Sequence, residues 1–137
     1  MKTAASKEVD TLLRDEWLRT VKELQHSVKI WASSEPGWST SEGEEHQIEE
    51  DPLGVYTAIS TNISMPNGRL ILEPIARNYP GRGIVELYAW PTLFRVRLLR
   101  GDSDDDWRVR VDSGFVLHQE WNRDNFIQLA NDLLGAS

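Results

Sequence analysis

The chain contains no cysteine, and this absence excludes several chemistries at once. Disulfide frameworks, thiolate nucleophiles and thiolate metal ligands all need the missing residue, and its absence fits a reducing compartment. Long apolar runs are missing as well. No segment approaches the roughly 20 apolar residues of a membrane span, and residues 1–8 lack the apolar core of a secretory signal. The sequence therefore predicts a soluble cytoplasmic protein with no membrane partner.

Recognisable catalytic motifs are also missing. The segment 101–105 lacks the last glycine of a nucleophile elbow, and the turn 80–83 lacks the residues that complete a dinucleotide or phosphate loop. Carboxylates are too numerous for the sequence to single out a general acid and base. The sequence thus indicates no enzyme class and no cofactor, and it favours a non-catalytic protein.

The net charge of −7 originates in one segment of the chain. Residues 35–52 contain seven acidic residues and no lysine or arginine, whereas acidic and basic residues balance elsewhere. Because an acidic chain is not drawn to phosphates by bulk charge, no nucleic-acid partner is expected. The same region is rich in serine, glycine and glutamate and poor in apolar residues. This composition predicts a flexible acidic loop at about residues 34–52.

Two amphipathic helices are predicted, one near each end of the chain. From about Ser6 to Ser33, apolar residues recur in steps of three and four, and the pair Pro36–Gly37 stops the pattern. Ser6 is the expected N-cap of this helix. Near the other end, Asn122 is the expected N-cap of a helix whose apolar stripe contains Phe126.

Between the helices the apolar period changes to two, which is typical of strands. Turn residues separate five such segments, at about residues 55–63, 69–77, 84–90, 94–98 and 107–111. Short connections between successive strands imply an antiparallel meander, and such a sheet can leave one face exposed to water. We therefore predict an α+β fold in a single domain spanning residues 1–137. In this fold an antiparallel sheet of about five strands carries the N-terminal and C-terminal helices on one face.

The most informative part of the sequence is the hairpin formed by the alternating runs 94–98 and 107–111. If their apolar residues share a buried face, the period of two places four arginines together on the other face, namely Arg95, Arg97, Arg108 and Arg110. If the strands pair in a register with an odd sum, for example with Val96 opposite Val111, Arg97 lies opposite Arg110, and facing like charges then destabilise the pair by some tenths of a kcal/mol. A carboxylate such as Glu73, Glu86 or Asp112 would offset that repulsion.

Two hypotheses on function follow. In the first, the chain is a regulatory or protein-interaction module that binds an acidic segment, from a partner or from its own acidic loop, because guanidinium groups match carboxylates. An ordinary ion-pair network is the alternative explanation of the arginines. In the second, a small-ligand domain binds an anion or haem in a cleft between sheet and helices, near Trp90, His118 and Trp121 and with the same arginines. Neither hypothesis fixes the oligomeric state.

No metal site is predicted. The loop 102–106 places carboxylates at the first, third and fifth positions of a calcium loop, but Trp107 replaces the required glycine and Ser113 replaces the bidentate glutamate. His46, among the glutamates of the acidic loop, is interpreted as part of a solvated tract. Calorimetric titration of the chain with calcium is therefore expected to show no saturable heat. A one-to-one binding isotherm would contradict this interpretation of the loop.

Overall fold

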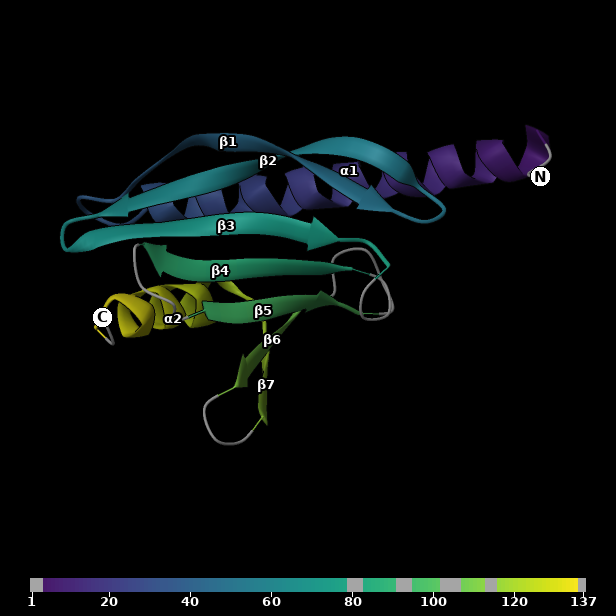
Figure 1. Ribbon diagram of the computed structural model, residues 1–137. Helices are drawn as coiled ribbons and strands as arrows, with labels where there is room; N and C mark the ends of the chain where they lie inside the picture. Colours follow the sequence, from purple (N-terminus) through teal and green to yellow (C-terminus); the bar gives the residue numbers. More distant parts are fainter. Residues whose placement is uncertain (1–3, 79–82, 91–94, 102–106, 113–115, 136–137) are drawn as a thin grey trace.

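The computed structural model describes residues 4–78, 83–90, 95–101, 107–112 and 116–135, without the side chains of residues 4–7 and 111–119. In this part of the chain, seven strands lie between two helices. In chain order, the elements are α1 (Ala4–Ser33), β1 (Ser39–Glu50), β2 (Gly54–Met65), β3 (Gly68–Ala76), β4 (Ile84–Trp90), β5 (Arg95–Arg100), β6 (Trp107–Asp112), β7 (Val116–Glu120) and α2 (Arg123–Gly135). The strands form one antiparallel sheet in chain order (Figure 1). The predicted α+β meander with terminal helices is confirmed. The five predicted strands correspond to β2–β6, so prediction missed β1 and β7.

Both helices lie on the same side of the sheet (Figure 1). The buried stripe of α1 includes Trp17, Val21, Leu24 and Val28, which follow one another in steps of three and four. This spacing keeps one helix face toward the strands, as predicted. The helix begins at Ala4, two residues before the predicted start.

The N-terminus of α2 is fixed by two side chains. The backbone N–H of Asn125 donates to Oδ1 of Asn122 at 2.9 Å, which confirms Asn122 as the N-cap. Arg123 reaches the end of α1, where its Nη2 donates to Oγ of Ser34 and to Oε1 of Glu35, both at 3.1 Å. These contacts set the start of the second helix beside the end of the first.

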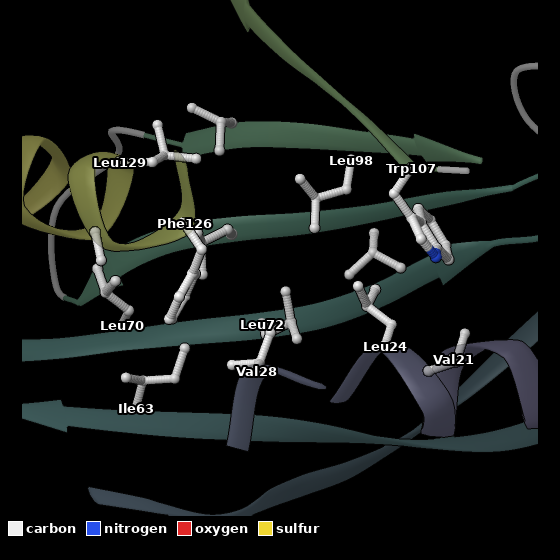
Figure 2. Close-up of a cluster of buried hydrophobic side chains, with 14 of the residues drawn as sticks. Val21, Leu24, Val28, Ile63, Leu70, Leu72, Leu98, Trp107, Phe126 and Leu129 are labelled. Carbon is white, nitrogen blue, oxygen red and sulfur yellow. The ribbon is translucent and has the colours of Figure 1, made fainter. Parts of the chain in front are cut away.

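The hydrophobic core fills the space between the helices and the sheet. Val28 of α1 and Phe126 of α2 are fully buried and meet Leu70 and Leu72 of β3 (Figure 2). Complete burial of a side chain of this size contributes about 1.5–3 kcal/mol relative to its exposure to water. The packing of two helix stripes onto one sheet face is therefore the main source of stability.

The predicted flexible acidic loop at about residues 34–52 is wrong, because most of it forms strand β1. The backbone of β1 pairs with β2 from Ser39 to Glu50, apart from a bulge between Glu42 and Glu45. Its composition disfavours a strand, but strand propensity depends strongly on the partner strand and on burial. β2 supplies the hydrogen bonds, and Ile48 is buried in the core cluster. Charged side chains on this edge strand also discourage pairing with other molecules.

The turn after β1 is held by the carboxylate of Glu50. Oε2 accepts a hydrogen bond from the backbone N–H of Arg77, and Oε1 accepts one from that of Asn78, both at 2.9 Å. The hydroxyl of Tyr56 also donates to Glu50. Burial of Tyr56, together with this hydrogen bond and the negative charge of Glu50, raises the pKa of the phenol well above its ordinary value. One residue of the acidic segment is thus a structural anchor.

The β1–β2 hairpin turns out of line with the rest of the sheet. Ile63 and Met65 are buried near the end of β2, whereas Tyr56 and Ala58, of opposite parity, are buried near its start. β2 pairs with β3 only from Thr61 to Met65. The first half of β2 therefore separates from β3 and presents its other face to the protein interior.

The bulge in β1 lies where this change occurs. A Cβ atom at Gly43 would approach the carbonyl oxygen of Ser60 to 3.1 Å, so the bulge brings the two strands unusually close. Further along β1, Nε2 of His46 lies 2.9 Å from the carbonyl oxygen of Pro74 in β3. This hydrogen bond joins two strands that are not sheet neighbours and holds the turned hairpin in place.

The close packing of Gly83 on Trp17 gives a test of this core. A Cβ atom at Gly83, where φ is +147°, would lie 2.3 Å from Cζ3 of the fully buried Trp17. We expect Gly83→Ala to lower the free energy of unfolding by about 3 kcal/mol, the upper end of overpacking costs, as measured by urea denaturation. The control is Gly54→Ala, where φ is +79° and no atom lies within 4 Å. That variant should lose only about 1 kcal/mol of backbone strain, and equal losses would contradict the packing argument.

Candidate functional site

The helices cover one face of the sheet and leave the other uncovered. In β3, Leu70 and Leu72 are buried against the helices. The residues that alternate with them, Arg69, Ile71 and Glu73, are half-buried or exposed. We call the uncovered side the open face; in β3 to β6 it includes Arg69, Ile71, Glu73, Glu86, Tyr88, Trp90, Arg95, Arg97, Leu99, Arg108 and Arg110. Direct cross-strand partners share a face, which makes this assignment a consequence of the register.

The four predicted arginines are brought together on the open face. Arg97 of β5 is the cross-strand partner of Glu86 in β4 on one side and of Arg110 in β6 on the other. Arg95 pairs with Tyr88, and Arg108 pairs with Leu99. The predicted sharing of one face is confirmed, and the strands adopt the register in which Arg97 faces Arg110.

Glu86 supplies the carboxylate that the facing arginines require. Its Oε1 lies 2.6 Å from Nη1 of Arg95, and its Oε2 lies 3.7 Å from Nε of Arg97. The glutamate is only 8% exposed, so these charges attract each other more strongly than a fully solvated pair. Of the three predicted carboxylates, Glu86 has this role, Glu73 contacts Tyr88 instead, and the side chain of Asp112 lies outside the described residues.

Two guanidinium groups of the open face stack on aromatic rings. The Cζ atom of Arg95 lies 4.8 Å from the ring centroid of Tyr88, and that of Arg69 lies 5.7 Å from the ring of Trp90. Burial and the neighbouring carboxylate of Glu73, which accepts a hydrogen bond from the Tyr88 hydroxyl at 3.4 Å, raise the pKa of Tyr88. Trp90 remains 55% exposed despite its size.

A groove of about 450 Å³ lies on the open face where the β1–β2 hairpin turns away. Its lining includes Glu42, Glu44, Ser60, Asn62, Glu73 and Trp90. Strands β1 and β2 therefore form one wall, and β3 and β4 form the opposite wall. The groove joins an exposed indole to polar and acidic side chains, which is a setting for recognition of a polar ligand or of a partner's side chain.

The predicted cleft near Trp90, His118 and Trp121 is wrong as a single site. Trp90 lies on the open face, whereas Trp121 packs on the helix side, with its ring centroid 5.6 Å from Trp31 and 5.5 Å from Phe126. Successive strand residues point to opposite faces, so the two tryptophans lie on opposite sides of the sheet. The sequence alone did not show on which side each one lies. The backbone of His118 pairs with that of Arg110, but its side chain lies outside the described residues.

The acidic segment does not cover the arginines either. β1 and β5 are separated in the sheet by β2, β3 and β4. The hypothesis that the four arginines bind the chain's own acidic loop is therefore wrong, since that segment is fixed at the opposite end of the sheet. Any acidic segment bound by these arginines has to come from elsewhere.

A separate cavity of about 240 Å³ lies between α1 and the strand ends of β6 and β7. Thr20, Glu23, Ser27 and Trp31 of α1 form one side, and Trp107 and Trp121 form the other. This volume is below the roughly 300–1,000 Å³ of pockets for drug-sized ligands. The cavity thus suits a ligand much smaller than haem.

Arg100 is a buried charge that sequence reasoning missed. Its guanidinium lies over the Trp17 ring at 5.4 Å, and its Nη1 donates to Oε1 of Glu16 at 3.0 Å and to Oγ1 of Thr20 at 3.4 Å. The alternation of β5 was the available signal, because Arg100 shares the parity of the buried residues Val96 and Leu98. Parity places the arginine on the helix side, where it needs a carboxylate.

Within the described residues, no three histidine, aspartate or glutamate side chains gather closely enough to hold a metal ion. Neither helix, over the residues described, combines the length and apolar character needed to cross a lipid bilayer.

The Glu86 network gives a stability test. We expect Glu86→Gln to lower the free energy of unfolding by about 1–3 kcal/mol, because the arginines then repel one another without the central carboxylate. This range allows for screening at Arg95 and Arg97, whose side chains are each 40% exposed. Glu44→Gln, a groove residue with no ion pair in the described part of the chain, is the control and should change stability by less than about 0.5 kcal/mol. Equal effects in urea denaturation would refute the role given to Glu86.

Models of protein families, curated protein sequences and solved structures all give no match to this chain. Function therefore has to be argued from the open face and the cavity themselves.

Proposed function

We propose that this chain is a non-catalytic interaction module that binds a partner protein through the open face, with Trp90 as the anchor. The observation that carries the proposal is the position of Trp90. This tryptophan is 55% exposed, borders the groove of about 450 Å³ and lies on the sheet face opposite α1 and α2. An indole this exposed leaves much of its apolar surface in water in the isolated chain, and a partner can bury that surface.

The composition of the open face supports this proposal. Tryptophan, tyrosine and arginine are the residues most enriched among interface hot spots. Here Trp90 and Tyr88 are each stacked by a guanidinium group, from Arg69 and Arg95 respectively. Stacking limits the motion of these long side chains before a partner binds, which lowers the entropic cost of forming an interface.

Charge favours an acidic partner segment at the β5–β6 end of the open face. Four arginines lie there, whereas the described carboxylates on these rows are Glu73, Glu86 and Glu120, and Glu120 is the cross-strand neighbour of Arg108. Guanidinium groups bind carboxylates in a planar, two-point geometry, so a segment bearing aspartate or glutamate would gain both affinity and orientation. The apolar part of the partner would then reach Trp90.

Site-specific photo-crosslinking tests the proposal. A benzoylphenylalanine residue at position 90 should give a discrete adduct with a protein from native cell extract. The same residue at position 55, where Val55 is 53% exposed but off the open face, should not. Excess wild-type chain should suppress the adduct.

Charge reversal provides the matched competitor. The double variant Arg97→Glu, Arg110→Glu should need at least about a tenfold higher concentration than the wild type to suppress the adduct. This corresponds to a loss of about 1.4 kcal/mol in binding free energy. Circular dichroism would verify that this variant is folded. Adducts of similar yield from positions 55 and 90, or equal suppression by both competitors, would refute binding through the open face. An adduct with a second copy of the chain would replace the proposed partner by self-association.

A further inference from the structure

The cavity between α1 and the strands β6 and β7 lies on the helix side of the sheet and is independent of the open face. Trp31 extends from α1, while Trp107 begins β6 and Trp121 follows β7. The backbone N–H of Trp121 donates to the carbonyl oxygen of Trp107 at 3.2 Å, so the strand ends place these two residues side by side. Half of the chain's six tryptophans thus meet at one small cavity.

The rings of Trp31 and Trp121 form one aromatic surface beside the cavity. They are inclined at 59° and pack on each other with centroids 5.6 Å apart. Trp107 packs instead on Trp17, at 6.1 Å, and also lines the cavity. Aromatic faces of this kind carry negative potential and attract cations within about 6 Å of the ring centre.

The charges around the cavity also favour a cation. Glu23 is the charged residue of the lining, is exposed at the cavity edge and has no ion-pair partner in the described part of the chain. Behind Thr20, the buried guanidinium of Arg100 is neutralised by Glu16. Together these groups leave one uncompensated negative charge, on Glu23. An anion would meet that charge unfavourably.

The lining distinguishes between kinds of cation. A primary ammonium group needs acceptors for three N–H donors. The cavity offers the carboxylate of Glu23 and the hydroxyls of Ser27 and Thr20, and the last already accepts a hydrogen bond from Arg100. A trimethylated ammonium group has no N–H donor, so it needs no acceptor, and it presents apolar methyl groups to the indole rings and to Leu24.

Nε1 of Trp121 is buried, has no hydrogen-bond acceptor among the described residues and is closed off from solvent, so it does not face a ligand in the cavity. The ligand is therefore defined by its cationic group. Choline is a small compound that carries a trimethylated ammonium group.

We propose that this cavity binds a small methylated ammonium compound of the choline type. The methylated nitrogen lies against Trp31, Trp107 and Trp121, and Glu23 balances its charge at the cavity edge. Binding is a recognition event with no covalent step.

Titration of the full chain with choline tests this assignment. Calorimetry should give saturable binding with a dissociation constant in the millimolar range or below. The uncharged analogue 3,3-dimethylbutan-1-ol, in which carbon replaces nitrogen, should bind at least about tenfold more weakly. In nitrogen–proton NMR spectra, the indole signals of Trp31, Trp107 and Trp121 should shift, while that of Trp90 on the open face should stay unchanged. Single tryptophan-to-phenylalanine variants assign these signals.

Two glutamate variants distinguish binding at this cavity from a general attraction of cations to the negatively charged chain. Glu23→Gln should weaken choline binding about fivefold or more. Glu8→Gln removes the same charge from an exposed position on the same helix and should leave binding unchanged, because the two positions lie about 22 Å apart along the helix, beyond the screening length. Trp121→Leu should abolish binding, and retained far-ultraviolet circular dichroism would show that this variant is folded.

Several results would overturn the proposal. Equal binding of choline and its uncharged analogue would show that the cavity recognises apolar volume alone. Equal effects of the two glutamate variants would remove Glu23 from the site. A shift of the Trp90 indole signal alone would place the cation on the open face. Tighter binding of a trimethyllysine peptide than of choline would contradict a free small compound as the ligand.

Discussion

Burial of one face of the sheet against two helices is the constraint on which the remaining features depend. Leu72, Leu87 and Val96 form a row of cross-strand partners on the helix side. Because successive strand residues point to opposite faces, the next row is turned to water and contains Glu86 and Arg97. A slip of one residue would exchange the two rows and bury the charges, so the register is strongly specified. The arginines therefore lie together on the open face because the apolar residues that alternate with them are buried in the core.

The same rule explains the buried ion pair on the helix side. Arg100 continues the parity of the core residues in β5 and therefore enters the space beneath α1. A charge in that position is costly unless it is paired, and Glu16, Thr20 and the ring of Trp17 surround it. Such a pair adds little net stability, but it penalises any other placement of α1 on the sheet.

Groove and cavity arise where regular packing stops. At one end of the sheet, the bulge at Gly43 turns the β1–β2 hairpin away from β3 and opens the groove beside Trp90. At the other end, α1 packs near β6 and β7 without filling the space between Trp31 and Trp107. The two hollows lie on opposite faces of the sheet, so occupation of one does not block the other.

Sequence periodicity alone determined the two helices, strands β2–β6 and the common face of the four arginines, because each is a local pattern whose apolar half must be buried. The N-cap Asn122 was equally local, since its side chain bonds the backbone three residues on. Only the tertiary structure decided that the acidic segment is a strand, because its hydrogen bonds come from β2 and its anchoring contacts from His46 and Glu50 to residues of the β3 region. The separation of Trp90 from Trp121 and the packing of Trp31 on Trp121 were likewise tertiary outcomes. They depend on which face each strand end presents to α1, and no local pattern carries that information.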